Sequence, residues 1–258
     1  MRSTDIRNTI INAATDPGVI LNIGNAVANA ARSTEAMAVN LATATLCLVI
    51  RTASELQKCG VVLPLPRFLR KLVENPGAAL MANGGMTLLS AAFAAANIRA
   101  DKPETTLPAI IMGLFASGNI AQGATCGKKG YGTAQRLSDA FAQSAYATAL
   151  VLASADAPMP VKLCFMFAGA SGVAMAALGR QSLFGVSPML IQAAGAYGSA
   201  ASNANPYFAA ANALWATGYV TLDALKRRGG VGEMFSAIFH RNKNRAQPAM
   251  EQPEPQTP

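Results

Sequence analysis

The sequence runs from Gln181 to Leu222 without a single Asp, Glu, Lys, Arg or His. In the middle of this run, the residues from Ser202 to Pro206 form a turn signal with apolar stretches on both sides. About 20 apolar residues in a helix cross the hydrocarbon core of a bilayer, so the run is long enough to cross twice. Two further uncharged runs, from Asn75 to Ile98 and from Thr105 to Gly127, support this interpretation. Because a soluble chain spreads charge over its surface at regular intervals, these gaps predict a polytopic membrane protein.

The composition favours a membrane bundle over a soluble domain. Of the 258 residues, 52% are hydrophobic and 13% are charged, and this charged share is roughly half that of an average globular protein. The mean hydropathy is only +0.27, because alanine dominates the apolar segments and scores weakly. Alanine and glycine also let helices approach closely in lipid. The alternative from composition is an alanine-rich soluble helical protein.

Apolar runs and their flanking signals predict an all-α fold, a transmembrane bundle of about seven to eight helices. The candidate helices cover residues 17–31, 35–52, 77–98, 106–125, 138–155, 160–178, 186–202 and 206–225. The first of them is short and rich in asparagine, which favours a re-entrant or partly inserted helix. The predicted parts are an N-terminal segment (1–34), the bundle (35–225) with a cytoplasmic loop at 53–74, and a basic amphipathic segment with a disordered tail (226–258).

The loop charges predict the orientation of this bundle. With the loop 53–74 in the cytoplasm, most loop lysines and arginines fall on the cytoplasmic side, as the positive-inside rule requires. That side holds Lys58, Arg67, Arg70, Lys71, Lys128, Lys129, Arg136, Arg180, Lys226, Arg227, Arg228, Arg241, Lys243 and Arg245, and the other side Arg32, Arg99, Lys102 and Lys162. We therefore expect a bacterial inner-membrane protein with a cytoplasmic C-terminus.

The net charge of +8 also bears on the partners. The basic residues lie between apolar runs without interleaved aromatic residues, which favours anionic lipid headgroups over nucleic acid. The segments Pro66 to Glu74 and Glu233 to Phe239 are amphipathic, typical either of a helix in the headgroup plane or of one packed on the bundle. Small-residue spacings such as Ala168 to Gly172 would suit packing within the chain, a homo-oligomer or another membrane protein.

Short matches along the chain indicate an internal repeat. Three predicted helices have a proline near their start and an isoleucine three residues later, at Pro17, Pro108 and Pro188. Asn40 and Asn212, each in the helix that follows, precede an Ala-Thr pair at the same distance. A period of three helices would produce inverted-topology repeats, which are common in transporters. Such matches also arise by chance in a chain rich in alanine and glycine, so duplication and chance both remain open.

The residues required for catalysis are missing from the predicted bundle. His240 is the only histidine and lies in the basic segment, so a Ser/His/Asp triad cannot be assembled among the helices. The stretch from Gly123 to Gly132 is glycine-rich but lacks the Walker A spacing. No cluster of His and Cys has the spacing of a metal site. We therefore expect neither an enzyme nor a bound metal or cofactor.

The predicted bundle contains neutral polar side chains that could bind a ligand. Among them, Asn119, Gln192 and Asn212 lie on helices of the suspected repeat, and Trp215 adds a stacking surface. An unpaired amide in hydrocarbon costs several kcal/mol, so each amide must face another helix or a wet cavity. The first hypothesis is a carrier that moves a small neutral polar solute, with these four residues as its binding site. The second is a non-catalytic structural or assembly subunit of a membrane complex, in which the amides join helices.

Overall fold

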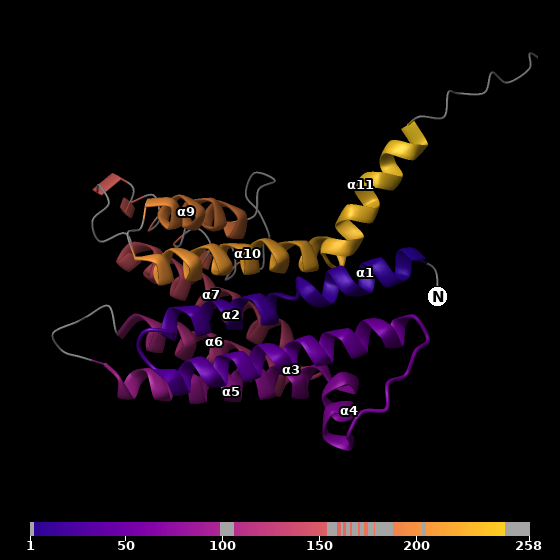
Figure 1. The fold of residues 1–258 in the computed structure, drawn as a ribbon, viewed down its shortest axis with the longest axis horizontal. Coiled ribbons are helices and arrows are strands. Elements are labelled where there is room, and N and C mark those ends of the chain that lie inside the picture. The colour runs from indigo at the N-terminus through magenta and orange to yellow at the C-terminus, as the bar shows by residue number, and fades with distance from the viewer. Residues whose placement is uncertain are drawn as a thin grey trace, which may run out of the picture.

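The computed structural model describes residues 3–98, 106–153, 188–202 and 205–245, together with isolated residues between 159 and 178. Within these residues the chain is all-helical and has no strand (Figure 1). The helices are α1 (Ser3–Ala14), α2 (Pro17–Asn29), α3 (Thr34–Lys58), α4 (Arg67–Glu74), α5 (Pro76–Ala96), α6 (Thr106–Thr125), α7 (Tyr131–Ala153), α9 (Pro188–Ser202), α10 (Pro206–Arg228) and α11 (Val231–Arg245).

Several helix ends follow from local sequence signals. Proline is the first residue of α2, α5 and α10, where its missing N–H costs no helical hydrogen bond. Each of these prolines follows an Asp or Asn cap; the Asp16 carboxylate, for example, accepts from the Gly18 N–H at 2.9 Å. Helix α10 ends at Gly229, which adopts a left-handed conformation with φ of 81°.

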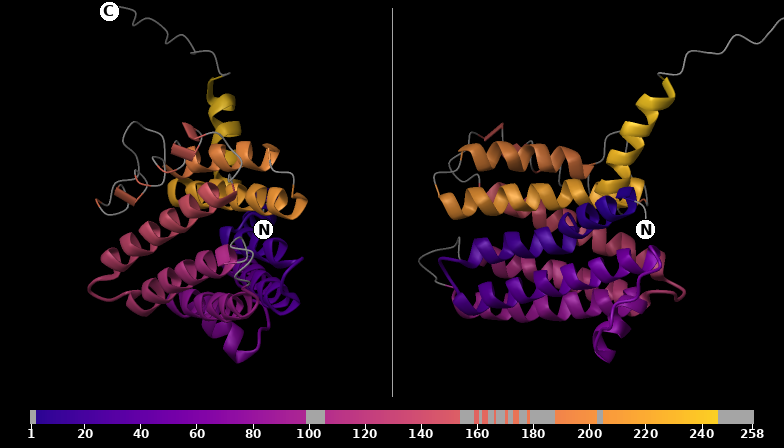
Figure 2. Two further views of the ribbon diagram at one scale, coloured as in Figure 1. Left: turned by 90° about the vertical axis from the view of Figure 1, so that its left-hand side faces the viewer. Right: turned by 45° about the vertical axis from the view of Figure 1, so that its right-hand side comes forward.

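The helices form a bundle whose long members run alongside one another (Figures 1 and 2). Helix α2 packs between α3 and α10, and α10 packs between α2 and α9. On the other side of α3 lies α5, which packs against α6, and α6 packs against α7. Helix α1 precedes α2 across a short break, whereas α4 and α11 diverge from the bundle direction at one end (Figure 1). The result is a layered arrangement with α2 and α10 near its centre.

The close contact of α5 with α6 depends on glycine. A Cβ atom on Gly77 would lie 2.8 Å from the Gly123 carbonyl oxygen, and one on Gly123 would lie 2.6 Å from the Gly77 carbonyl oxygen. One on Gly84 would lie 3.0 Å from the Ala116 carbonyl oxygen. Backbone atoms cannot move aside for a side chain, so these helices pack at a distance that only small residues allow.

The bundle buries several amide side chains and exposes many large apolar ones. Its fully buried side chains include the amides of Asn29, Asn40, Gln192 and Asn212, whereas much of the exposed surface is apolar. Exposed apolar residues of the long helices include Leu41, Leu48, Met81, Leu88, Leu89, Phe93, Ile110, Leu137 and Phe141. Asn and Gln are ordinarily at the surface of soluble proteins, and apolar patches there mark contact with a membrane or a partner.

Two helices, α3 and α5, are long and apolar enough to cross a membrane. Only 28% of the apolar window of each is buried in the protein, so most of that window faces outward. This length and composition suggest membrane association. Helix α9, predicted as a full crossing, has 15 described residues, fewer than the about 20 that a perpendicular crossing needs.

Most predicted helices coincide with observed ones to within about one turn: 17–31 with α2, 77–98 with α5, 106–125 with α6, 186–202 with α9 and 206–225 with α10. Two boundaries differ. Helix α3 continues to Lys58 rather than ending near residue 52, and α7 begins at Tyr131 rather than near residue 138. The loop predicted at 53–74 therefore begins with a helical turn and contains α4. The predicted helix 160–178 lies mostly outside the described residues.

Basic residues gather at the end of the bundle where α3, α6 and α10 terminate. These residues are Lys58, Arg67, Arg70, Lys71, Lys128, Lys129, Arg136, Lys226, Arg227 and Arg228. Figure 1 shows the ends of α3 and α10 on one side, with α4 and α11 beside them. Arg32, in the turn between α2 and α3, lies at the opposite end. We call the first of these ends the basic end.

Candidate functional site

Trp215 lies in the core between α10 and α2. Its indole is 2% exposed, and Nε1 donates a hydrogen bond to the Asn25 Oδ1 at 3.1 Å. Gly24 makes room for the ring, because a Cβ atom there would lie 2.7 Å from the indole Cδ1. The only polar group of Trp215 is therefore already bonded, and the indole joins two helices as well as offering a surface.

Asn212 lies one turn before Trp215 on α10 and is 0% exposed. Neither its amide nitrogen nor its amide oxygen has a hydrogen-bond partner in the described part of the chain. Leaving a buried polar group unpaired costs about 1–3 kcal/mol. The side chain therefore brings a donor and an acceptor into the core, and no described residue uses either.

The other two predicted site residues lie at different distances from this core. Gln192 is fully buried on α9, next to Ala193, which belongs to the same cluster of buried residues as Trp215. Asn119 is half-buried on α6, one turn beyond Phe115, whose ring centroid lies 6.4 Å from that of Tyr219. The structure thus brings Gln192, Asn212 and Trp215 to the packed helices α9, α10 and α2, and it leaves Asn119 on a neighbouring helix.

A second set of buried polar side chains surrounds Met112 of α6. It was not predicted from the sequence. The Met112 sulfur accepts hydrogen bonds from Ser90 Oγ at 3.3 Å, from Asn40 Nδ2 at 3.5 Å and from Asn29 Nδ2 at 3.8 Å. These donors come from α5, α3 and α2, so one thioether collects polar contacts from three helices. Because sulfur is a weak acceptor, this arrangement joins helices without strong hydrogen bonds.

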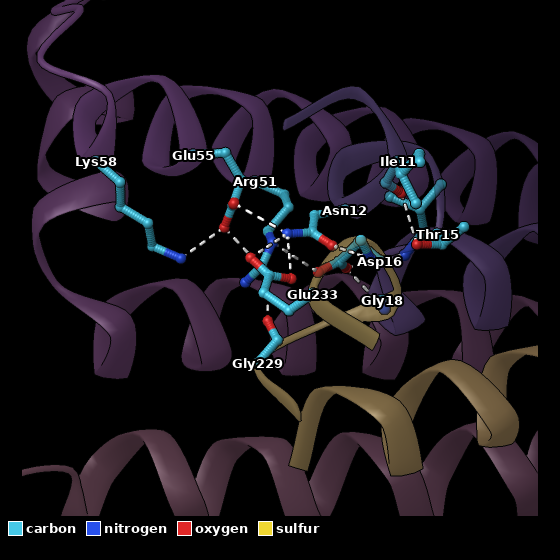
Figure 3. A network of polar contacts seen from close by, with 12 residues as sticks. Ile11, Asn12, Thr15, Asp16, Gly18, Arg51, Glu55, Lys58, Gly229 and Glu233 are labelled. Atoms are coloured by element: carbon cyan, nitrogen blue, oxygen red, sulfur yellow. Dashed lines mark hydrogen bonds and ion pairs between the residues drawn. The ribbon is translucent and has the colours of Figure 1, made fainter. Parts of the chain in front are cut away.

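A charged network connects α1, α3 and α11 at the basic end (Figure 3). The Asn12 amide nitrogen donates to Glu55 Oε2 at 3.1 Å and to both Glu233 oxygens, at 2.8 and 3.0 Å. The Asn12 oxygen accepts from the Gly232 N–H at 2.8 Å. One amide therefore connects two carboxylates and the start of α11.

Two basic side chains form ion pairs with carboxylates of this network. Arg51 Nη2 lies 3.1 Å from Glu55 Oε1, and Lys58 Nζ lies 2.6 Å from the same oxygen. Arg51 Nε also lies 3.9 Å from Asp16 Oδ2, in the connection between α1 and α2. Burial raises the pKa of the Asp16 carboxyl, and the Arg51 charge opposes that rise. The network thus combines two basic side chains with three carboxylates, one of which, Glu233, is bonded to the neutral Asn12 amide.

This network was not predicted from the sequence, although the sequence contains a signal for part of it. Arg51, Glu55 and Lys58 are spaced for ion pairs along one helix face, which would have extended the helix predicted at 35–52. The contribution of Asn12 and Glu233 could not be found in this way, since they are separated by 221 positions.

The described residues do not bring together three His, Cys, Asp or Glu side chains that could hold a metal ion. Comparison with models of protein families, with curated proteins and with solved structures finds no match for this chain.

Proposed function

We propose that the protein is an integral protein of the bacterial inner membrane, with its basic end and its C-terminus in the cytoplasm. The buried amides and the exposed apolar side chains support this location, since both suit a chain surrounded by lipid. The collection of lysine and arginine at one end supports the orientation. In this proposal seven to eight helices cross or enter the membrane, α3 and α5 among them.

The internal repeat is part of this proposal. Helices α2, α6 and α9 would be equivalent, as would α3, α7 and α10. Each helix of the first set packs against the helix of the second set that follows it in sequence, which a repeated unit requires. Because the period is three helices, successive units would have opposite orientations in the membrane, as in many carriers.

We further propose that the protein is a carrier for a small neutral polar solute. The observation that carries this proposal is the Asn212 amide, which is fully buried and finds no partner for its donor or its acceptor among the described residues. A solute with a hydroxyl or amide group could supply both. Gln192 adds a second buried amide from α9. These residues are uncharged, which favours a neutral solute, because a buried ion requires a partner of opposite charge.

Uptake into proteoliposomes tests the carrier proposal. Purified protein is reconstituted, and the entry of urea, glycerol and small polyols is followed by osmotic light scattering. We expect at least one of these solutes to enter faster than in empty vesicles, and Asn212→Ala to abolish that excess. The matched control is Asn97→Ala, which removes an exposed amide at the end of α5 and should leave the flux unchanged. Equal fluxes with Asn212→Ala and the unmodified chain would exclude the proposed site.

The second candidate function is a non-catalytic subunit of a membrane complex. The hydrogen bond of Trp215 to Asn25, at 3.1 Å, and that of Asn22 to Asn83, at 3.3 Å, favour it, because these amides join helices. An assembly subunit would be recovered from native membranes in a stoichiometric complex of defined mass. A carrier would be recovered alone or as a homo-oligomer, so mass measurement after extraction in native lipid discs separates the two candidates.

A further inference from the structure

A groove of about 360 Å³ lies at the basic end, lined by residues of α9, α10 and α11. We call it the α10–α11 groove. It lies beside the turn at Gly229, where the chain leaves the bundle and enters α11. The residues of the proposed solute site do not line it. Any ligand of this groove is therefore a separate question from the proposed solute.

The polar part of the groove carries excess positive charge. Its charged lining residues are Asp223, Arg227 and Arg228. Asp223 and Arg227 form an ion pair with an N–O distance of 3.1 Å. Arg228 is exposed, and no carboxylate in the described ranges lies within ion-pair distance of it. One unit of positive charge thus remains for a ligand, which fits the single negative charge of a phosphodiester.

The rest of the lining is apolar. Leu190 of α9 and Val220 of α10 line the side nearer the bundle. Met234, Ala237 and Ile238 line the α11 side, at the spacing of one helix face. Ile238 is 51% exposed, so this wall opens to the outside of the protein. An acyl chain would cover these apolar side chains, whereas a hydrophilic metabolite would leave them exposed to water.

On α10, the apolar and the charged lining residues are separated along the helix axis. Val220 and Arg227 are seven positions apart on α10, which corresponds to about 10 Å along the helix axis. The arginines are the residues nearer the basic end, where α10 terminates. A phosphate at the arginines would therefore lie at headgroup level, with the hydrocarbon chain beside Val220 at a deeper level.

We propose that the α10–α11 groove binds one anionic phospholipid from the leaflet at the basic end. Its phosphate is held by Arg228 with help from Arg227, and an acyl chain lies against Val220, Met234 and Ile238. Basic pockets between membrane helices recognise anionic lipid headgroups in this way. The inference rests on the membrane location proposed above and does not depend on carrier activity.

Lipid titration followed by native mass spectrometry tests this inference. The full chain, purified in detergent, is titrated with dioleoylphosphatidylglycerol or with the zwitterionic dioleoylphosphatidylcholine. We expect the anionic lipid to bind with an affinity at least about fivefold higher than that of the zwitterionic lipid. This factor corresponds to the contribution of one basic residue near an anionic headgroup. Glycerol 3-phosphate, which carries the phosphate without acyl chains, should not displace it. Equal affinity for the two lipids would overturn the inference, and displacement by glycerol 3-phosphate would replace it with a site for soluble phosphate.

Variants locate the binding. Arg228→Gln should weaken phosphatidylglycerol binding about fivefold, and Arg228→Lys should restore most of it. Ala237→Trp should block the groove whatever its charge. Arg70→Gln, which removes an exposed arginine of α4 at the same end, is the matched control and should have no effect. Unchanged binding in Arg228→Gln or Ala237→Trp, or equal loss in Arg70→Gln, would overturn the site. If Ala237→Trp does not fold, the Gln and Lys variants of Arg228 still show whether the lipid binds in this groove. If the unmodified chain moves none of the solutes but binds the anionic lipid as expected, the result counts against the carrier proposal alone.

Discussion

Replacing Asn212 by alanine should make the bundle more stable while it removes function. Asn212 is 0% exposed, and no residue in the described ranges pairs with either of its amide atoms. An unpaired buried polar group costs about 1–3 kcal/mol. The alanine leaves a void of about one water molecule, roughly 30 Å³, which costs roughly 0.7 kcal/mol at about 24 cal/mol per Å³. The net change is a gain of between roughly 0 and 2 kcal/mol in the free energy of unfolding.

The same substitution at Asn25 should have the opposite sign. Asn25 is 5% exposed, and its oxygen accepts the indole N–H of Trp215. Asn25→Ala leaves that N–H unpaired in the core and should lower the free energy of unfolding by about 1 kcal/mol or more. The two variants therefore make a matched pair, in which the same atoms are deleted from two buried positions.

Reversible unfolding by dodecyl sulfate in mixed micelles measures both changes. We expect Asn212→Ala to unfold at the same or a higher mole fraction of dodecyl sulfate than the unmodified chain, and Asn25→Ala at a lower one. Equal destabilisation by the two variants would refute the reasoning, because the Asn212 amide would then have a structural partner. If the Asn212→Ala protein is stable but moves no solute, the unpaired amide serves ligand binding and not the stability of the fold.

Three further predictions concern packing, the charged network and orientation. Gly84→Val should lower the free energy of unfolding by about 1–3 kcal/mol, since the new side chain would overlap atoms of α6 and force α5 and α6 apart. Gly85→Val, where a Cβ atom meets nothing within 4 Å, should be far milder in the same micelle assay. Asn12→Ala should detach α11 and speed trypsin cleavage in its basic segment, and normal cleavage would show that the network does not hold α11. In a cysteine-free background, Val62→Cys, 79% exposed beside the basic end, should react with impermeant maleimide only from the cytoplasmic face; reaction from the periplasm would reverse the orientation.

Much of the fold could be predicted from the sequence where signals are local. The starts of α2, α5 and α10 follow from a capping residue and a proline, and the uncharged runs contain α5, α6, α9 and most of α10. The end of α3 could not be placed by charge alone, because Arg51, Glu55 and Lys58 pair with one another within the helix. Charges that are neutralised in this way no longer mark a loop.

The candidate site could be predicted only in part. Burial of Gln192, Asn212 and Trp215 is consistent with their position in apolar helices, but the partner of Trp215 is Asn25, 190 positions away. No periodicity in the sequence identifies that pair, which depends on how α10 packs against α2. The absence of a partner for Asn212 depends on the same packing. Long-range contacts therefore decide which amides join helices and which remain for a ligand.

The central claim is that the bundle, with amides inside and apolar side chains outside, lies within a membrane. Washing bacterial membranes that contain the full chain with alkaline carbonate tests it most directly, because this treatment strips peripheral proteins and leaves integral ones. We expect the chain to stay in the membrane pellet, as a known integral protein does in the same sample. Release of the chain into the supernatant, together with a peripheral control protein, would contradict the claim.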